Sequence, residues 1–346
     1  MRKKWPFIAT GLLLVILVGL MALFRGGSTE GRTLTTLRKV DDFPLFVMDY
    51  YADYGFDRFL QEGLRSDRRS GSGRQDTTAG WACTCFASLS QEGHLLFGRN
   101  FDWYVHPALL LFTHPPEGYA SVSMVDISYL GFDAQDYEGD KATEPSWSDR
   151  RRLLDAPYLP FDGMNEHGLA VGMMAVPYAK ASQTNEVTIS SLHAIRLLLD
   201  YATDVDEAIS LLRNYNIDFG DGPPLHYLIS DSSGNSAVVE FIDGEMNVLR
   251  NRDPWQVATN FVISDTMPEG ATSSCSRYNT TYETLEQTEG HVSHQEAMAL
   301  LHNVSQSGSY PTIWSTVYNM TTGDIQVVMG RKYEQVNTFR LEMKGK

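Results

Sequence analysis

The distribution of apolar and polar residues separates the first 82 residues from the rest of the chain. Residues 5–24 form an uncharged, almost continuously apolar run, and about 20 such residues in a helix span the hydrocarbon core of a membrane. Residues 26–31 are rich in glycine and predict a short flexible linker. In residues 37–64, aromatic and aliphatic residues recur at intervals of about three or four, which predicts helix. Residues 66–80 are polar and rich in glycine, serine and arginine, which predicts a loop.

From Cys83 onward, short apolar runs alternate with turn residues, a pattern typical of strands and hairpins. The first predicted hairpin joins residues 83–89 to residues 94–99, and residues 162–168 predict another turn. Further strands are predicted at 169–176, 226–230, 237–241, 256–260, 312–319 and 325–329, and helices at 190–202, 204–215, 276–285 and 293–303. Strands grouped around paired helices predict a layered α+β domain.

Three basic residues, Arg2, Lys3 and Lys4, precede the apolar run. Because basic flanks stay on the cytoplasmic side, the run predicts a single-pass anchor in the cell membrane, with the rest of the chain on the extracytoplasmic side. The alternative is a cleaved signal peptide and a secreted protein, but the length of the run favours the anchor. We therefore predict an anchor at residues 1–25, a linker and helical prosegment at 26–82, and a globular domain at 83–346.

Composition narrows the classes of function. The formal net charge is -15, and the excess of acidic residues lies after residue 82. An acidic surface repels phosphate backbones, so nucleic-acid binding is not expected. The chain has three cysteines and no CxxC, HxxxH or HExxH pattern, so no metal or cofactor is predicted. The sequence carries no signal for the oligomeric state.

Cys83 begins the predicted hairpin, and the return strand carries Arg99 and Asp102. A guanidinium beside a thiol favours the thiolate, which is the nucleophilic form, and a carboxylate can hold an amine in place. This trio lacks a general base. Cleavage between Ala82 and Cys83 would supply one, because the new α-amino group has a pKa of about 7.7–8.0 and lies beside its own thiol. The loop at 66–80 would expose that junction to cleavage.

Several motifs follow one another in the order of a known family. They are Cys83-Thr84, 98–103 (GRNFDW), 162–169 (DGMNEHGL), 226–240 (HYLISDSSGNSAVVE), Thr259-Asn260, 276–278 (SRY) and 312–319 (TIWSTVYN). Together they resemble the linear amide hydrolases of the N-terminal-nucleophile type, which include choloylglycine (bile salt) hydrolases, penicillin V acylases, acid ceramidase-like enzymes and penicillin acyltransferases. The resemblance covers residues 83 to about 330 and leaves out the predicted anchor and prosegment.

This resemblance implies a four-layer αββα sandwich and a hydrolase of linear amide C–N bonds that acts on small-molecule N-acyl amides. It implies Cys83 as the nucleophile and Asn260 as a donor to the oxyanion. The other site residues that it implies are Arg99, Asp102 and a second arginine, Arg277. Hydrolysis and acyl transfer to a second amine are both compatible with it.

The chain departs from the bile salt hydrolases at Ala175, where those enzymes carry an asparagine that lines the oxyanion hole. Only a backbone N–H is therefore expected to serve the oxyanion near Ala175. This departure resembles the acyltransferase-like members and disfavours bile salts. A neutral or weakly polar amide with an apolar acyl half fits the acidic chain better.

Two other functions stay open at the level of the sequence. A papain-like cysteine protease would also use Cys83, but no histidine occurs in a motif that would supply its base. A membrane-tethered extracellular binding protein would have an inert Cys83, because buried cysteines are usually packing residues. Cys85 and Cys275 either form a disulfide or stay free, and both states fit an extracytoplasmic protein.

Overall fold

The computed structural model of the protein describes residues 27–64, 82–90, 92–137, 144–181, 184, 186–220, 222–266 and 275–345. The expected anchor at residues 1–25 and the expected loop at residues 66–80 lie outside the described residues. Among the helices of the described residues, none combines the length and the apolar character that crossing a membrane requires.

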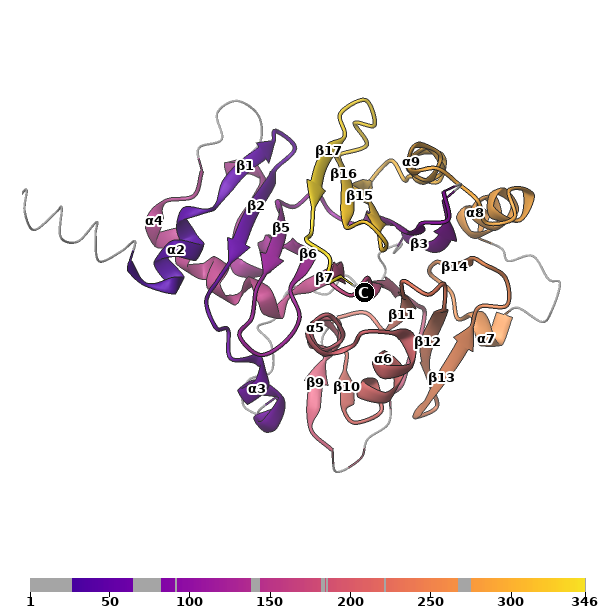
Figure 1. The fold of residues 1–346 in the computed structure, drawn as a ribbon, viewed down its shortest axis with the longest axis horizontal. Helices are drawn as coiled ribbons and strands as arrows, with labels where there is room; N and C mark the ends of the chain where they lie inside the picture. The colour runs from indigo at the N-terminus through magenta and orange to yellow at the C-terminus, as the bar shows by residue number, and fades with distance from the viewer. Residues whose placement is uncertain are drawn as a thin grey trace, which may run out of the picture.

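Most strands belong to two sheets, which Figure 1 shows side by side. In the larger sheet, all neighbouring strands are antiparallel except β2 and β5, which run parallel. Its nine strands, in spatial order, are β1 (Arg38–Asp41), β2 (Leu45–Tyr50), β5 (Ala108–Thr113), β6 (Ser121–Asp126), β7 (Pro160–Asn165), β8 (Ala170–Ala175), β11 (Leu225–Ser230), β12 (Ser236–Ile242) and β13 (Glu245–Arg250).

The smaller sheet is antiparallel throughout and carries the first predicted hairpin. Its six strands, in spatial order, are β14 (Gln256–Ala258), β3 (Ala82–Leu89), β4 (Leu95–Asp102), β15 (Thr312–Asn319), β16 (Asp324–Met329) and β17 (Asn337–Arg340). A separate parallel pair consists of β9 (Thr188–Ser190) and β10 (Asn216–Asp218). The predicted hairpin at Cys83 is confirmed as β3 and β4.

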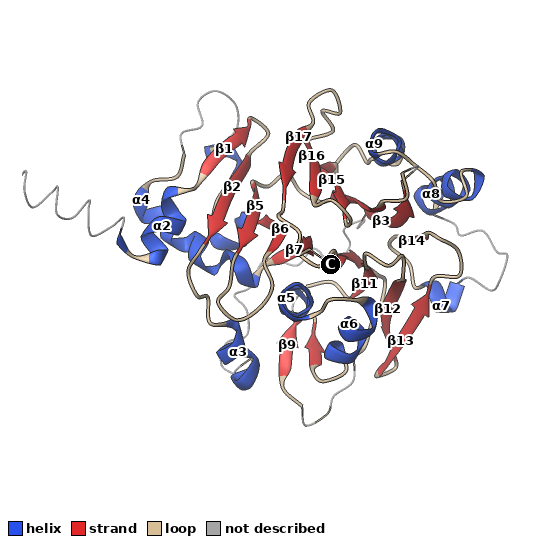
Figure 2. Cartoon of the chain, in the orientation of Figure 1, coloured by secondary structure: helices blue, strands red, loops and turns tan. Residues whose placement is uncertain are grey.

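Helices cover the outer sides of both sheets (Figure 2). On the nine-stranded sheet, α5 (Ser191–Tyr201) packs on β7 and β8, and α6 (Val205–Leu212) packs on β11 and β12. On the six-stranded sheet, α8 (Ser276–Gln287) packs on β3 and β14, and α9 (His294–Asn303) packs on β4 and β15. The mixed α+β architecture is therefore confirmed, with the two sheets between two layers of helices.

The two sheets face each other most closely where β8 crosses β3. Gly172 lies at this crossing, and a Cβ there would stand 2.9 Å from Cys85 Sγ and 3.2 Å from Arg99 Cδ. Only a residue without a side chain allows such a close approach, so Gly172 fixes the spacing of the sheets beside the first hairpin.

The predicted helix over residues 37–64 is wrong for most of its length. Strands β1 and β2 occupy Arg38–Asp41 and Leu45–Tyr50, and only α3 (Phe56–Glu62) is helical. Almost every residue of β2 is buried, so the strand shows no alternation of apolar and polar positions. Its aromatic residues happened to fall at helical intervals. The segment that precedes Cys83 thus supplies strands to the nine-stranded sheet.

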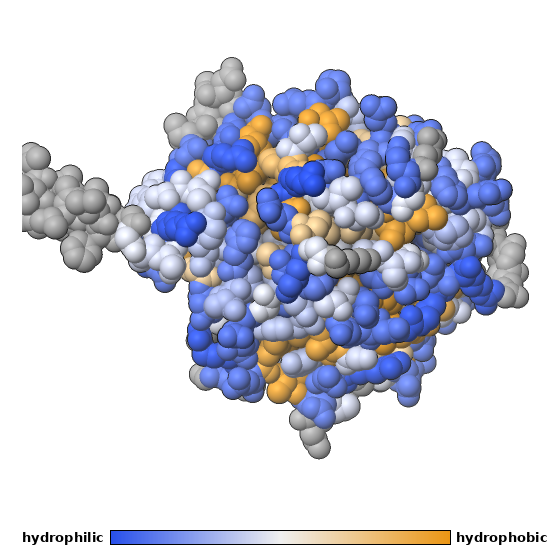
Figure 3. Space-filling view, viewed as in Figure 1, coloured by the Kyte–Doolittle hydropathy of each residue, from blue (hydrophilic) through white to orange (hydrophobic). Residues whose placement is uncertain are grey.

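The remaining helices are short and lie mainly in the connections. They are α2 (Thr29–Thr35), α4 (Trp147–Arg150) and α7 (Ile263–Thr266), with 3-10 turns η1 (Ile127–Leu130), η2 (Ala134–Asp136) and η4 (Arg151–Tyr158). The surface in Figure 3 is largely hydrophilic with scattered apolar patches, in keeping with the excess of acidic residues.

Candidate active site

Cys83 is the second residue of β3, and its side chain is 5% exposed. In the β3–β4 ladder, Cys83 lies opposite Phe101 and Cys85 lies opposite Arg99. Side chains two residues apart on a strand share a face, so both thiols and the guanidinium point to the same side of the hairpin. This side faces β8, across the crossing at Gly172.

Arg99 is fully buried and spreads its guanidinium over both thiols. Its Nη2 lies 3.9 Å from Cys83 Sγ, and its Nη1 lies 3.1 Å from Cys85 Sγ. The same Nη1 donates to the carbonyl of Met173 on β8, and Nε donates to Asp162 at 2.9 Å. The predicted proximity of Arg99 to Cys83 is present in the structure, and the guanidinium also ties β4 to the opposite sheet.

Asp162 is a site residue that the sequence analysis missed. It lies on β7, inside the segment that was predicted to be a turn, and its side chain is fully buried. Besides Arg99, it accepts hydrogen bonds from Trp314 Nε1 at 3.0 Å and from the Tyr318 hydroxyl at 2.6 Å. A buried carboxylate requires such partners. The Asp-Gly pair is a turn signal, and it concealed this role.

Asn260 and Arg277 surround the backbone of Cys83. The Cys83 N–H donates to Asn260 Oδ1, and the Cys83 carbonyl accepts from Arg277 Nη1. Arg277 also donates to Thr84 Oγ1 at 3.1 Å and to Asn260 Oδ1 at 3.1 Å. Asn260 follows β14, and Arg277 lies in the first turn of α8, so two separate elements converge on one residue.

Ala175 ends β8 beside Asn260. Its carbonyl accepts a hydrogen bond from Asn260 Nδ2 at 2.8 Å, and the residue is 4% exposed. The structure thus places Ala175 and Asn260 in direct contact, although they are far apart in the sequence. Asn260 in turn accepts a hydrogen bond from the backbone N–H of Cys83.

Asp102 occupies the end of β4, directly opposite Ala82. Its Oδ1 accepts a hydrogen bond from the Thr312 hydroxyl, whereas its buried Oδ2 has no hydrogen-bond partner among the described residues. Burial raises the pKa of Asp102 to about 7, against the lowering effects of Thr312 and Arg277. The chain therefore keeps an unsatisfied carboxyl oxygen next to the Ala82–Cys83 junction.

The Cys83 thiol lies in a desolvated position. Burial raises its pKa above the ordinary value, and the nearby guanidinium of Arg99 lowers it without compensating. In the uncut chain, desolvation therefore outweighs the positive charge of Arg99. Burial likewise raises the pKa of Cys85 to about 12. A base close to Cys83 is needed before this sulfur can attack.

The cysteines are not joined by a disulfide, so Cys85 and Cys275 do not form one. Cys275 accepts a hydrogen bond from the Thr259 hydroxyl at 3.4 Å, next to Asn260. Within the described ranges, no group of three histidine, cysteine, aspartate or glutamate residues is arranged to hold a metal ion.

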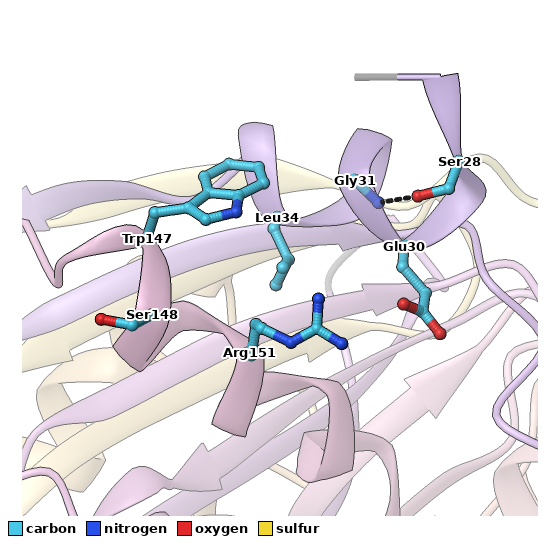
Figure 4. Close-up of a pocket in the computed structure, with 7 residues that line it drawn as sticks. All are labelled: Ser28, Glu30, Gly31, Leu34, Trp147, Ser148 and Arg151. Atoms are coloured by element: carbon cyan, nitrogen blue, oxygen red, sulfur yellow. Dashed lines mark hydrogen bonds between the residues drawn. The ribbon is translucent and has the colours of Figure 1, made fainter. Parts of the chain in front are cut away.

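A separate pocket lies at the other end of the nine-stranded sheet, between α2 and α4 (Figure 4). Leu34 and Trp147 give it an apolar wall, and Glu30 and Arg151 bring opposite charges to it. Figure 1 shows α2 and α4 at the far side of the fold from β3 and β14. This pocket is therefore distinct from the cluster around Cys83.

Comparisons with known proteins point to one family. Residues 160–334 match the model of the acyl-coenzyme A:6-aminopenicillanic acid acyltransferase family. A penicillin V acylase of Pectobacterium atrosepticum is 34% identical over 111 residues, which are 29% of this chain and 29% of that protein. An uncharacterized protein of Paramecium bursaria Chlorella virus 1 is 34% identical over 119 residues, which are 31% of this chain and 40% of that protein. The chain thus spans well under two thirds of the length of either relative.

Solved structures share the fold. A conjugated bile acid hydrolase from Clostridium perfringens superposes with a TM-score of 0.55 at 18% identity, over 76% of this chain and 93% of that chain. A penicillin V acylase from Agrobacterium tumefaciens gives a TM-score of 0.53 at 20% identity, over 75% and 86% of the two chains. At such identities the likeness concerns the fold alone. With half of its residues matched by the family model, the chain belongs to the acyl-coenzyme A:6-aminopenicillanic acid acyltransferase family of N-terminal-nucleophile hydrolases.

Proposed function

We propose that the protein is an amidase that cleaves linear N-acyl amides with Cys83, after the peptide bond between Ala82 and Cys83 has been cut. The observation that carries this proposal is that both the backbone and the side chain of Cys83 are held by polar contacts. The amide, the carbonyl and the thiol of Cys83 each have a polar partner, in Asn260, Arg277 and Arg99. A packing cysteine needs none of these contacts.

Sequence spacing in a structural relative supports the same assignment. Crystal structures of the Clostridium perfringens bile acid hydrolase exist for a cysteine-to-alanine variant at its position 2 and an arginine-to-leucine variant at its position 18. Cys83 and Arg99 have the same separation of 16 residues. The two positions chosen for substitution in that enzyme therefore correspond in spacing to the thiol and guanidinium of this site.

The freed amine completes the catalytic group. Once the bond is cut, the Cys83 amine takes the proton of its own thiol, and the sulfur attacks the amide carbonyl of the substrate. Asp102 Oδ2, which lacks a partner next to Ala82, is placed to accept from that amine. Asn260 Nδ2 and a backbone N–H near Ala175 then donate to the oxyanion, a contribution of roughly 3 kcal/mol for each donor.

The acyl group leaves Cys83 in a second step. In the first step, the amine of Cys83 returns the proton to the departing nitrogen, and the amide C–N bond breaks to leave a thioester. In the second step, either water or a second amine attacks the thioester and releases the thiol of Cys83. The family model is named for acyl transfer, whereas the bile acid hydrolase and penicillin V acylase are named for hydrolysis. We propose hydrolysis of a small N-acyl amide with an apolar acyl half, with acyl transfer as a second reaction of the same thioester.

Intact mass spectrometry and N-terminal sequencing of the purified protein test the cut. We expect a chain that begins Cys-Thr-Cys-Phe, whereas Cys83→Ala should stay uncut, with no chain that begins Ala-Thr-Cys-Phe, and should show no turnover of amide substrates. Cys85→Ser is the matched control, because Cys85 also contacts Arg99 but has no amine to gain. Full amidase activity from an uncut chain would remove the amine from the mechanism. Loss of activity in Cys85→Ser but not in Cys83→Ser would assign the other thiol.

The substrate class needs a separate measurement. We expect kcat/KM on neutral N-acyl homoserine lactones of several chain lengths to exceed kcat/KM on glycocholate. Ala175 replaces the asparagine of the bile salt hydrolases, and the acidic chain lowers the local concentration of anionic substrates. A wide preference for glycocholate would contradict both arguments.

A further inference from the structure

A polar cluster lies behind the proposed oxyanion donor and touches no part of Cys83. It consists of His226 on β11 and Glu240 on β12, two neighbouring strands of the nine-stranded sheet. Both side chains are almost completely buried, with exposures of 1% for His226 and 2% for Glu240. Buried ionisable groups cost free energy unless they are paired, so their retention calls for an explanation.

His226 reaches across to the opposite sheet. Its Nε2 lies 2.7 Å from the carbonyl oxygen of Thr259, the residue before Asn260. A carbonyl can only accept, so this nitrogen carries a proton and donates it. The Nδ1 of the same ring contacts Glu240 Oε1 at 3.2 Å, which fixes the orientation of the ring.

Glu240 holds the residues that follow Asn260. Its Oε1 accepts from the backbone N–H of Ile263 at 2.6 Å, and its Oε2 accepts from the N–H and the hydroxyl of Ser264, at 3.1 and 2.6 Å. Burial alone would raise the pKa of Glu240, but the hydrogen bonds from His226, Ser264 and Ile263 outweigh it and leave the pKa below its usual value. The carboxylate thus serves as a charged acceptor for one short loop.

We propose that His226 and Glu240 are positioning residues that clamp the backbone on both sides of Asn260. His226 fixes the carbonyl of Thr259 before it, and Glu240 fixes Ile263 and Ser264 after it. The clamp orients the Asn260 amide between Cys83 and Ala175. The proposal rests on the proposed function, because it assigns the clamp a role in stabilising the oxyanion.

The geometry explains why a clamp is needed at this position. Asn260 lies two residues after the end of β14, a strand of three residues at the edge of its sheet. Past Ala258 no sheet ladder holds the chain, and α7 begins only at Ile263. An oxyanion donor that can drift by about 1 Å loses much of its effect, because preorganisation is the source of the stabilisation. The pair His226–Glu240 supplies the missing constraint from the other sheet.

Kinetics of His226 variants test the clamp. We expect His226→Phe to lower kcat on the order of 10-fold to 100-fold, with KM nearly unchanged. This decrease should be smaller than the decrease in kcat caused by Asn260→Ala. His226→Gln keeps an N–H donor within reach of Thr259 and should recover much of the loss. His193→Phe is the matched control, because His193 packs against Phe59 and Tyr158, away from the site, and should leave kcat unchanged.

A double variant separates positioning from general loss of structure. If His226 acts through Asn260, then His226→Phe should cost little further rate in an Asn260→Ala background. The same full loss in both backgrounds would overturn the proposal, as would a change confined to KM or wild-type kinetics for His226→Phe.

Hydrogen exchange provides a readout that does not depend on turnover. In His226→Phe and Glu240→Gln, the amides of residues 259–264 should exchange faster than in the wild type, while His193→Phe leaves them unchanged. Unchanged protection of this loop would refute the clamp. A wild type without Cys83-dependent turnover would instead refute the proposed function, and the exchange measurement would still decide the clamp.

Discussion

Two arginine–aspartate pairs are buried in this molecule, and they serve different regions. Arg99 pairs with Asp162 at 2.9 Å beside Cys83, and Arg196 pairs with Asp200 at 2.8 Å within α5. Both arginine side chains are fully buried. By burial and distance alone, the two pairs cannot be told apart.

Their other contacts distinguish them. Besides Asp162, the Arg99 guanidinium contacts the carbonyl oxygen of Met173 and two thiols. Arg196 donates to Ser121 Oγ at 2.6 Å, while its Nε and Nη1 have no hydrogen-bond partner among the described residues.

The second pair joins two parts of the chain. The Tyr54 hydroxyl donates to both carboxylate oxygens of Asp200 at 2.8 Å, which attaches the segment before Cys83 to α5. A buried ion pair is therefore no sign of catalysis by itself. The contact with Cys83, the proposed nucleophile, is what distinguishes Arg99.

The largest difference between the pairs should appear in turnover. We expect Arg99→Met to lower kcat/KM for an amide substrate by about 1000-fold, which corresponds to about 4 kcal/mol, because the sulfur loses its positive neighbour. Steady-state kinetics on folded protein, checked by circular dichroism, measure this loss. Arg99→Lys keeps the charge but not the planar guanidinium, so its kcat/KM should lie between those of the wild type and Arg99→Met. Wild-type kinetics in Arg99→Met would make the two pairs equivalent.

Stability should show the opposite contrast. Arg196→Met leaves Asp200 buried without its cation, and we expect the free energy of unfolding to fall by about 3 kcal/mol. The kcat of the protein that remains folded should stay within about threefold of the wild type, since Arg196 lies outside the site. Denaturant titration and kinetics on the same sample test both statements. A large loss of kcat with intact stability would place Arg196 in the catalytic group.

Asp102 sharpens the comparison, because it is a buried aspartate that pairs with no arginine among the described residues. Its folded pKa of about 7 exceeds the ordinary value of 3.8, so its ionisation destabilises the fold. This penalty is absent below about pH 4, grows as the pH rises, and is complete above about pH 7, where its limit is about 4 kcal/mol. Asp102→Asn removes the charge but buries an amide that also needs hydrogen-bond partners. We therefore expect it to stabilise the fold by about half of that penalty.

The measurement is the free energy of unfolding as a function of pH, with Cys83→Ala as the background so that the chain stays uncut. Asp102→Asn should stabilise that background by about 2 kcal/mol at pH 8 and by almost nothing at pH 4. Equal effects at both pH values would show that Asp102 is held as a carboxylate by partners of its own.

The sequence predicted the elements after Cys83 better than the start of the fold. The hairpin at Cys83 and the helices around 190–212 were recognisable, because their apolar residues follow the period of a strand or a helix. In β2 (Leu45–Tyr50), burial on both faces erased that period, and aromatic residues at helical spacing replaced it. Pairing with β5, which begins almost 60 residues later, decides this strand, and no local pattern reports such a partner.

The site shows the same division. Cys83, Arg99 and Asp102 lie in one hairpin, where spacing alone brings them together. Asp162 and the pair His226–Glu240 were missed because their roles depend on the facing sheet, through Arg99 in one case and Thr259 in the other. Single residues in buried strands carry no local signal for such contacts. Only the resemblance of whole motifs placed Asn260 and Arg277 near Cys83.

The parallel pairing of β2 with β5 has a consequence for biosynthesis. Strand β2 covers one edge of β5 along Ala108–Thr113, and β1 lies beyond it. In a chain translated only from Cys83 onward, that edge of β5 would be unpaired. Unpaired apolar strand edges pair with other chains and cause aggregation. The leading residues therefore act as a built-in template for folding. The proposed cut before Cys83 would end the covalent continuity of the protein, but the pairing of β2 with β5 would hold these strands in place, so expression vectors should encode them.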